Sequence, residues 1–431
     1  MKIVIALLII GLLIFVHEFG HFVVAKTCGV LVKEFSIGMG PRILKYKRKD
    51  TLYSIKLLPF GGACLMAGMD GDDDIGDRSY LSKSVWKRMA IIVAGPLFNL
   101  ILAFLFSVIF ISKVGYDPCI IGRVSDNSPA AEAGLMPGDQ IIKVNNKKVT
   151  FYEDFYLYEY AHEGETLNIT YLRDNEKYTT SIVPVYVDKN VYQMGVSIES
   201  SKTSVPVKIV DVTKDSPAQN AGIEAGDIVE AINSEKVNDY NDLLSLMEKY
   251  GEEEITVTVN RNGTLKDFKL VATKIHQQYY NKGFDLANVW VKVNPIKTIG
   301  YSFKYTGYWA KSVFTGFKML INKKASFNDF SGPVGIVNLV GTVVEETKSD
   351  GLLTVIMNLL NFCIMISANL AVMNILPIPA LDGGKFLFLV IEAVRGKPVP
   401  REKEGMVHLI GVILLFIFTL AVLFNDIRKL F

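Results

Sequence analysis

The sequence predicts a polytopic α-helical membrane protein with four transmembrane helices, two inserted α+β domains and a membrane-associated β-hairpin. Three observations support this fold class. Half of the 431 residues are hydrophobic, and the mean hydropathy is positive, at +0.28. Four long apolar runs occur along the chain, and two copies of one motif lie between the second and third runs. The formal net charge of +2 is too small to indicate nucleic-acid binding.

The four apolar runs are long enough to cross a bilayer, for which about 20 residues suffice. The first run has a cleavable signal peptide as its alternative. It is long for one, however, and it carries His17-Glu18-Phe19-Gly20-His21 where a small-residue cleavage site would stand. The runs are Ile3–Ala25, Met89–Ile111, Leu352–Leu376 and Met406–Phe424. We expect the transmembrane helices within residues 1–25, 89–112, 346–384 and 405–427.

The distribution of lysine and arginine predicts the orientation. Residues 26–88 and an expected loop at 385–404 are both rich in these residues, which favours a cytoplasmic position. Both termini and the long stretch between the second and third runs then face outward. Within residues 26–88, alternating apolar residues, several glycines and the apolar stretch Leu57–Met66 indicate a β-hairpin that dips toward the membrane.

The stretch between the second and third runs contains an internal repeat with an offset of 88 residues. Two copies indicate two small globular domains rather than a solenoid. The pattern resembles that of PDZ domains, so we expect PDZ-like domains at residues 113–187 and 188–275. An exposed strand edge in each would bind an extended peptide, and inert spacer domains are the alternative. The matching segments are Ser128-Pro129-Ala130, Ala133-Gly134-Leu135 and Gly138-Asp139, then Ser216-Pro217-Ala218, Ala221-Gly222-Ile223 and Gly226-Asp227.

Residues 276–345 are expected to form a linker that contains an amphipathic helix, Pro295–Ile321. Lysine recurs there every seven residues, so a helix stacks the lysines along one stripe while aromatic residues crowd its other sides. This pattern is typical of a helix that lies in the membrane interface. A packed soluble helix is the alternative. The lysines are Lys297, Lys304, Lys311 and Lys318.

The first apolar run carries the residues that point to metal chemistry. His17 and His21 lie four positions apart, so a helix directs both imidazoles toward one point, as a tetrahedral zinc ion requires. Glu18 lies beside them. Three ionisable side chains within a spanning helix are costly, and a bound dication offsets that cost. A proton relay is the alternative.

A catalytic zinc site needs a third protein ligand and an open position. His162 and His276 fall in the outside stretch, and His408 is a lone histidine at the edge of the fourth run. Asp382 is the better candidate, because prolines end the third run just before it and two glycines follow it. A helix-capping or turn aspartate is the alternative.

These motifs together resemble the site-2 protease family, and within it the bacterial regulator-of-sigma-E branch with two PDZ domains. The likeness covers nearly the whole chain. It is carried by His17-Glu18-Phe19-Gly20-His21, Leu381-Asp382-Gly383-Gly384, Gly95-Pro96-Leu97-Phe98-Asn99, Ser331-Gly332-Pro333-Val334-Gly335 and the two repeats.

The resemblance implies an intramembrane zinc metalloprotease that cuts single-span membrane proteins, such as an anti-sigma factor or a remnant signal peptide. By this likeness His17, His21 and Asp382 bind Zn²⁺, and Glu18 is the general base. Asn374 and Asn99 bind substrate, while the hairpin pairs with the unwound substrate strand. The expected location is the bacterial cytoplasmic (inner) membrane, with the PDZ-like domains outside and the active site toward the cytoplasm.

Two other functions remain open at this point. The first is a membrane protease whose His-Glu-x-x-His motif works with a glutamate on a large cytoplasmic domain, but no such domain is evident. The second is a PDZ-bearing membrane scaffold with a structural zinc site. Glu18 argues against the scaffold, because a structural site has no use for a base.

Overall fold

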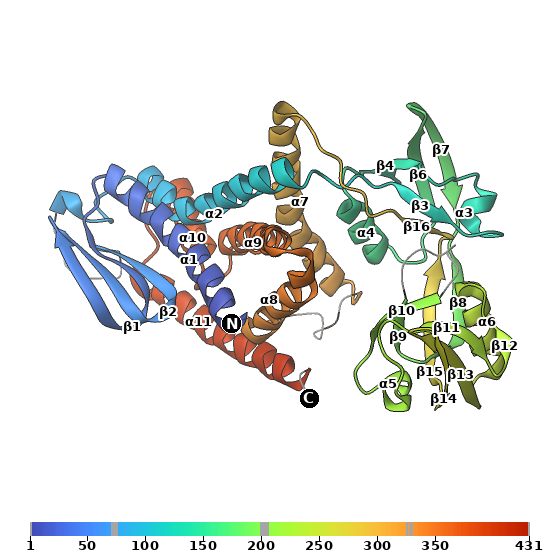
Figure 1. The fold of residues 1–431 in the computed structure, drawn as a ribbon. Coiled ribbons are helices and arrows are strands. Elements are labelled where there is room, and N and C mark those ends of the chain that lie inside the picture. The colour runs from blue at the N-terminus through green and yellow to red at the C-terminus, as the bar shows by residue number, and fades with distance from the viewer. Residues whose placement is uncertain (1, 70–75, 199–206, 325, 327–330, 430–431) are drawn as a thin grey trace.

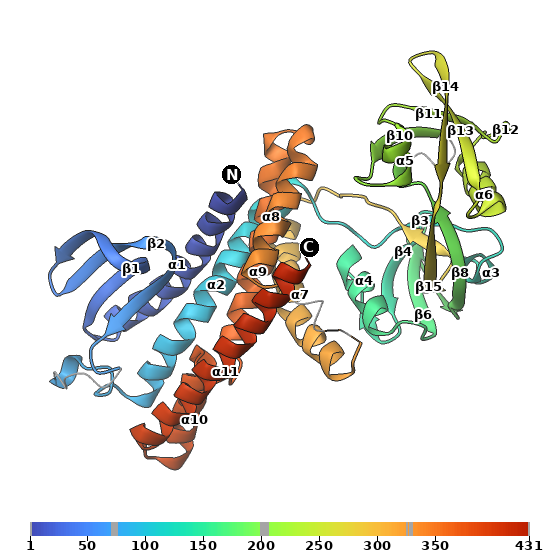
Figure 2. The same ribbon diagram turned by 90° about the horizontal axis from the view of Figure 1, so that it is seen from below.

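The computed structural model describes residues 2–69, 76–198, 207–324, 326 and 331–429. A bundle of long helices forms one part of the molecule, and two small β-rich domains form the other (Figure 1). A long β-hairpin projects from the side of the bundle that faces away from the two domains (Figure 2). The bundle holds the three residues singled out above as metal ligands, and the base of the hairpin packs beside it.

Among the described residues, four helices are long and apolar enough to cross a membrane. They cover the predicted runs to within one residue, although α2 begins four residues and α11 five residues earlier than its run. α2 packs against both α1 and α9, so it is the central helix, whereas α11 makes few contacts. The four helices are α1 (Lys2–Thr27), α2 (Val85–Lys113), α9 (Leu352–Ile375) and α11 (Arg401–Arg428).

The expected cytoplasmic loop at 385–404 is wrong, because most of it is a helix, α10 (Asp382–Arg395). The third spanning helix accordingly ends at Ile375 and does not extend to residue 384. Apolar residues at helical spacing, including Phe386, Leu389 and Val390, pack α10 onto the core between α1 and α2. Gly396, with φ of +69°, ends the helix in the left-handed conformation that suits glycine.

The predicted hairpin consists of two long antiparallel strands, β1 (Val32–Arg48) and β2 (Thr51–Met66). Its base packs on α1, where Val32 and Phe35 are buried. Its far half is exposed and mixes apolar with basic side chains, with Ile43 and Leu44 both more than half exposed next to Lys45. Such a mixed surface fits the expected contact of the hairpin with the membrane interface.

The two β-rich domains have matching strands and helices. Repeat domain 1 consists of residues Ile121–Ile182 together with one later strand, and repeat domain 2 consists of Val196–Val271. Domain 1 contains β3 (Ile121–Val124), α3 (Pro129–Glu132), β4 (Gln140–Val144), β5 (Lys147–Lys148), α4 (Tyr152–Ala161), β6 (Leu167–Arg173) and β7 (Glu176–Ile182). Domain 2 contains β9 (Val196–Ile198), β10 (Val207–Val212), α5 (Pro217–Ala221), β11 (Ile228–Ile232), β12 (Glu235–Lys236), α6 (Tyr240–Tyr250), β13 (Glu254–Arg261) and β14 (Thr264–Val271).

The predicted tandem arrangement, with domains at 113–187 and 188–275, is wrong because repeat domain 2 is inserted within repeat domain 1. Strand β3 of domain 1 pairs with β16 (Phe284–Leu286), which follows domain 2 in the chain. In domain 2, strand β9 takes the place that β16 takes in domain 1, and it pairs with β10. A two-stranded ribbon of β8 (Val185–Gln193) and β15 (Thr273–Asn281) connects the two domains.

Each repeat domain is therefore completed by a strand that follows the core of the other. Gly195 precedes β9 and Gly283 precedes β16, and these glycines show the same 88-residue offset as the repeat. A Cβ atom on Gly195 would overlap Ser216, and one on Gly283 would overlap Ser128. Both glycines have positive φ, so the close contact and the backbone conformation both require glycine here.

Two further helices, α7 and α8, lie between repeat domain 1 and α9 in the chain. α7 (Pro295–Ile321) has the predicted bounds and runs across the end of α2 (Figures 1 and 2). One side of α7 is buried on α2 and α9, where Tyr305 Oη lies 2.8 Å from Asn361 Oδ1. All four lysines are exposed, as are Ile296 and Phe303, so α7 packs on the bundle and still presents an amphipathic outer surface.

The helix α8 (Pro333–Thr347) lies against α1 and α9. Its N-terminus is capped by a side chain from the far end of α11. The buried carboxylate of Asp426 accepts hydrogen bonds from the N–H groups of Gly332 and Gly335, at 3.0 and 2.8 Å. A carboxylate at a helix N-terminus satisfies free N–H groups and interacts favourably with the helix dipole.

Candidate metal centre

The two histidines project from the inner face of α1 because they lie one turn apart. Gly20, between them, is in contact with Ala94 of α2, and a Cβ at residue 20 would overlap the Ala94 carbonyl. The same close approach continues at Gly95, where a Cβ atom would overlap the His21 ring and lie 2.9 Å from Cε1 of His17. These glycines make room for two buried imidazoles between the helices.

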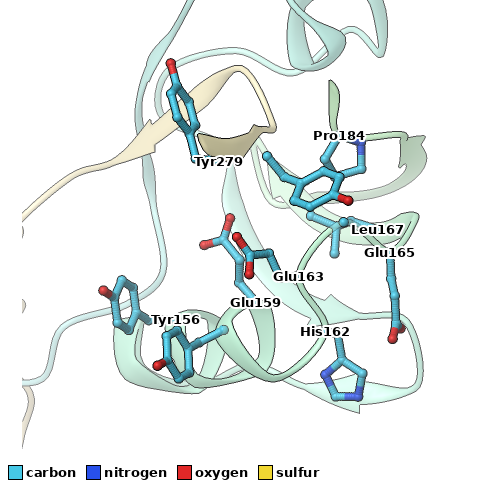
Figure 3. A pocket seen from close by; sticks show the side chains of 11 residues that line it. Tyr156, Glu159, His162, Glu163, Glu165, Leu167, Pro184 and Tyr279 are labelled. Carbon is cyan, nitrogen blue, oxygen red and sulfur yellow. The ribbon is translucent and has the colours of Figure 1, made fainter. Parts of the chain in front are cut away.

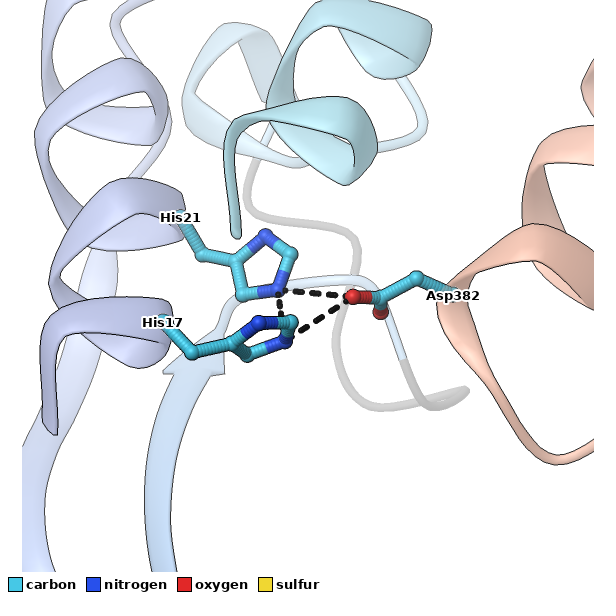
Figure 4. A group of neighbouring side chains, drawn as sticks. All are labelled: His17, His21 and Asp382. Carbon is cyan, nitrogen blue, oxygen red and sulfur yellow. Dashed lines mark hydrogen bonds and ion pairs between the residues drawn. The ribbon is translucent and has the colours of Figure 1, made fainter. Parts of the chain in front are cut away.

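Asp382 approaches the histidines from the start of α10 (Figure 4). Its Oδ2 atom lies 3.0 Å from Nε2 of His17 and 3.2 Å from Nε2 of His21, and the two Nε2 atoms are 3.2 Å apart. These three form the single group of potential metal ligands among the described residues. The structure thus brings together the three residues predicted as ligands.

The triangle of ligand atoms has the dimensions of a zinc site. In a tetrahedral zinc site with bonds of about 2.0–2.1 Å, ligand atoms lie roughly 3.3 Å apart. Asp382 Oδ2 is also buried, and apart from the two imidazole Nε2 atoms it has no hydrogen-bond partner among the described residues. A buried carboxylate oxygen in this condition is costly unless a cation binds it. The residues present therefore fit a zinc ion.

The Nδ1 side of each imidazole contacts a residue of α2. His21 Nδ1 lies 2.8 Å from the carbonyl oxygen of Ile91, so this nitrogen carries the proton and donates it. Nε2 of His21 is then free to bind metal, because the neutral ring has one donor and one acceptor nitrogen. Gly95 and Pro96 lie in the next turn of α2, where the proline cannot donate a backbone hydrogen bond.

Asn99 occupies the matching position behind His17. Its side chain is completely buried, with Nδ2 3.4 Å from Nδ1 of His17, while its Oδ1 atom is buried without a partner among the described residues. Rotating the amide by half a turn would place Oδ1 against an Nδ1–H group and satisfy both atoms. The burial of Asn99 favours support of His17 over direct contact with a substrate.

Asp382 follows a tight turn between α9 and α10. Gly383 and Gly384 let the first turn of α10 pack on the last carbonyl groups of α9 and on the turn itself. A Cβ on Gly384 would lie 2.7 Å from the carbonyl oxygen of Ile378. The two glycines after Asp382 therefore determine how close α10 comes to α9, and so where the carboxylate points.

The other two predicted site residues lie beside the triangle without belonging to it. Glu18 is half-buried and lies against the hairpin, since a Cβ on Gly62 of β2 would be 2.9 Å from Cγ of Glu18. Asn374 is half-buried near the end of α9. No hydrogen bond or ion pair joins either side chain to another described residue, so both are available for a water molecule or a substrate.

A separate pocket of about 180 Å³ lies in repeat domain 1, beside the ribbon (Figure 3). Tyr156, Glu159 and Glu163 line it, and Glu159 is paired with Lys282 at 2.6 Å. His162 also lines this pocket, which confirms that it is not a ligand of the metal centre. Its ring is stacked on Tyr158 instead.

Sequence reasoning missed the roles of Gly95 and Asn99 at this centre. A glycine followed by a proline inside an apolar helix is an unusual pair that marks a place where another group must come close. That signal was present, but it did not identify which group approaches. Contact between Asn99 and His17 depends on how α1 and α2 face each other, which local patterns do not specify.

The whole chain is similar to known proteases. The model of the peptidase family M50 matches residues 5–418. A zinc metalloprotease, RasP, of Bacillus licheniformis is 29% identical over 507 residues, covering 99% of this chain and 98% of the relative. The regulator of sigma-W protease RasP of Bacillus subtilis is 29% identical over 459 residues, with the same coverages of 99% and 98%.

One similar solved structure covers part of the chain. The PDZ domain of HtrA3, solved with a phage-derived ligand, is 20% identical and covers 21% of this chain and 92% of that domain, with a TM-score of 0.18. The two repeat domains resemble each other in their order of strands and helices and in their shared offset.

Proposed function

The chain belongs to the peptidase family M50, and from this membership and the geometry of its metal centre we propose that it hydrolyses peptide bonds in or beside the transmembrane segments of single-span membrane proteins. It is a zinc metalloprotease and an integral bacterial membrane protein. The observation that carries the proposal is the triangle of His17, His21 and Asp382, which is built between spanning helices with Glu18 beside it.

Four side chains divide the chemistry. The metal would be held by Nε2 of His17, Nε2 of His21 and Oδ2 of Asp382. When bound, zinc acts as a Lewis acid that activates water and polarises the scissile carbonyl. Glu18, which has no partner among the described residues, accepts the proton of the attacking water and delivers it to the leaving nitrogen.

A substrate must be extended at the point of cleavage, because the carbonyls of a helix are already hydrogen-bonded. We infer that the unwound segment lies along a free edge of the β1–β2 hairpin, where it adds as a further strand. This placement is supported by the contact between Gly62 of β2 and Glu18, since a strand there passes next to the base. Asn374 is available to hydrogen-bond the backbone on the other side.

The orientation proposed from the basic residues agrees with the arrangement of the bundle. The hairpin precedes α2 in the chain and the repeat domains follow it, so the two are attached to opposite ends of this helix, as a cytoplasmic hairpin and outer domains require. The exposed apolar residues of α7 and its lysines fit a helix in the outer interface. The repeat domains, which are PDZ-like in their sequence motif, then control access according to the bulk of the outer part of the substrate.

The test combines zinc content with turnover. Purified protein is assayed with a single-span substrate before and after removal of zinc by a chelator, and again after zinc is restored. We expect cleavage to disappear and return with the metal. His162→Ala, which alters a histidine in the separate pocket, should leave both zinc content and cleavage unchanged. Zinc binding without any turnover would instead support the scaffold with a structural site.

A further inference from the structure

The turn that presents Asp382 is in contact with α11. The middle of this helix makes little contact with the bundle, since all residues from Val412 to Ala421 are exposed, whereas its far end packs on α8. Near its start, Nδ1 of His408 accepts a hydrogen bond of 3.1 Å from the backbone N–H of Ala380. One turn later, Gly411 is buried against Pro379, and a Cβ at residue 411 would overlap that proline.

Ala380 has an unusual backbone conformation. Its φ is +81°, which side-chain-bearing residues rarely adopt because the Cβ atom crowds the backbone. The other non-glycine residues with positive φ in the described chain are asparagine, aspartate, serine or lysine, so Ala380 is the one apolar residue among them. It lies two residues before Asp382. A hydrogen bond of 3.2 Å from the Leu381 N–H to the Ile378 carbonyl closes the turn, and contacts to the turn help to hold it, because alanine does not favour this conformation.

His408 is the group that contacts the strained residue directly. An imidazole nitrogen that accepts a hydrogen bond carries no proton, so the proton of His408 is on Nε2, which lies 3.9 Å from Oε1 of Glu404. The ring is also packed on Phe388 of α10, with centroids 5.6 Å apart. His408 therefore joins three elements at one point: the turn, the helix that begins with Asp382, and α11.

We propose that His408 is a positioning residue for the metal ligand Asp382. Its hydrogen bond to Ala380 holds the turn in the conformation that directs the carboxylate of Asp382 toward His17 and His21, and Gly411 allows α11 to come close enough for that bond. The proposal rests on the proposed function in one respect, namely that Asp382 binds the metal. Positioning residues do not bind the metal themselves, yet their loss typically weakens metal binding about 10- to 100-fold.

The experiment measures the zinc dissociation constant of the full-length protein in detergent, by competition with a fluorescent chelator. His408→Phe keeps a ring for packing but removes the acceptor, so zinc affinity should fall by about ten-fold. His408→Asn places an amide oxygen where Nδ1 stood and should retain most of the affinity. Leu409→Ala, which alters an exposed neighbour on α11, is the matched control and should bind zinc as the unaltered protein does.

A double variant tests the mechanism itself. Glycine accepts a positive φ without strain, so adding Ala380→Gly to His408→Phe should recover much of the lost zinc affinity. A simple loss of packing at α11 would not be repaired by a change in the turn. The proposal is overturned if His408→Phe binds zinc as tightly as Leu409→Ala does, or if Ala380→Gly restores nothing while the double variant unfolds at the same temperature as the single one.

Asp382→Asn separates this inference from the proposed function. If that variant binds zinc normally, Asp382 is not a ligand, and the assignment of the metal centre fails together with this proposal. If Asp382→Asn loses zinc while His408→Phe retains it, the metal centre stands and only the role of His408 is wrong.

Discussion

The repeat domains and the metal centre are stabilised in opposite ways. In repeat domain 1, Arg173 binds the buried carboxylate of Asp139 through two hydrogen bonds of 2.7 Å. Repeat domain 2 has the same pair, Arg261 and Asp227, at 2.7 and 2.8 Å. Each arginine also donates to a backbone carbonyl at the end of the domain's first short helix.

The metal centre has no such duplicate. Its ligands come from the first spanning helix and from the turn before α10, near opposite ends of the chain, and α2 supports them from between. Asp139 and Asp227 each bind their own arginine, whereas Asp382 Oδ2 has only the two imidazoles as polar partners among the described residues. The repeat domains therefore neutralise their buried carboxylates internally, while the metal centre is left to be completed by a cation.

The largest expected effect on cleavage comes from variants of the metal centre. Glu18→Gln keeps the shape of the side chain and removes the base, so cleavage should fall by about 10²- to 10⁴-fold while zinc stays bound. Asp382→Asn weakens a charged ligand, so zinc content and cleavage should fall together. Metal analysis and a cleavage assay on each purified variant measure both quantities. If Asp382→Asn keeps its zinc while Glu18→Gln loses it, the assignment of ligand and base is reversed.

The next effect concerns the ion pair of repeat domain 2. Arg261→Met leaves the fully buried Asp227 without its cation, which should destabilise that domain by about 3 kcal/mol. Hydrogen exchange of β11 and β13 measures it, with Lys214→Met on the same domain as the exposed control. Zinc content should not change. Loss of zinc in Arg261→Met would show that the two regions are not independent.

The same pair predicts a pH dependence. Burial alone would raise the pKa of Asp227, but hydrogen bonds from Arg261 and from the Glu224 N–H outweigh it and hold the pKa below its ordinary value of 3.8. The unfolded state then binds more protons, so the stabilisation is present above pH 3.8 and is lost as the pH falls through the lower folded value. Hydrogen exchange of domain 2 from about pH 5 to pH 2.5 should show this loss. Asp227→Asn should show a shallower dependence.

The smallest effect on chemistry is expected from removing repeat domain 2. Gln193 and Thr273 are paired at the end of the ribbon, so residues 194–272 can be replaced by an Asn-Gly turn that keeps β16 in repeat domain 1. Cleavage of a substrate with a short outer segment should change less than about two-fold, while substrates with bulky outer domains should be cut more readily. Cleavage rates on the two substrates measure this, and unchanged selectivity would argue against a filtering role.

A matched deletion makes the same test sharper. Removing residues 188–275, the bounds expected for a tandem domain, also removes most of β8 and the start of β15. That deletion should disturb repeat domain 1, because β16 would no longer be led back to β3. Equal stability of the two deletions would contradict the nested arrangement.

Much of this molecule was predictable from local patterns. The four apolar runs predicted the four helices that are long and apolar enough to cross a membrane, and the seven-residue lysine spacing predicted α7 with its observed bounds. His17 and His21 were predictable because a helix places residues four apart on one face. Asp382 was predictable because prolines and glycines around it mark an irregular backbone, and the structure brings it to the histidines.

What could not be predicted depends on which segments meet in space. The exchange of β9 and β16 leaves no trace in the repeat, since both strands keep the 88-residue offset whichever core they join. α10 was mistaken for a loop because its lysine and arginine content resembles that of cytoplasmic loops, although Phe386, Leu389 and Val390 follow helical spacing. The contact of His408 with Ala380 depends on where α11 docks, and a single histidine carries no pattern.

The exchanged strands also impose an order in time. Phe284 of β16 is buried in the core of repeat domain 1, yet it is synthesised only after all of repeat domain 2. At roughly 5–20 residues per second, the ribosome makes the first core and supplies its missing strand on the order of ten seconds later. During that interval repeat domain 2 can close around its own β9. Repeat domain 2 is thus completed first, and repeat domain 1 keeps one strand edge unpaired until β16 has been synthesised.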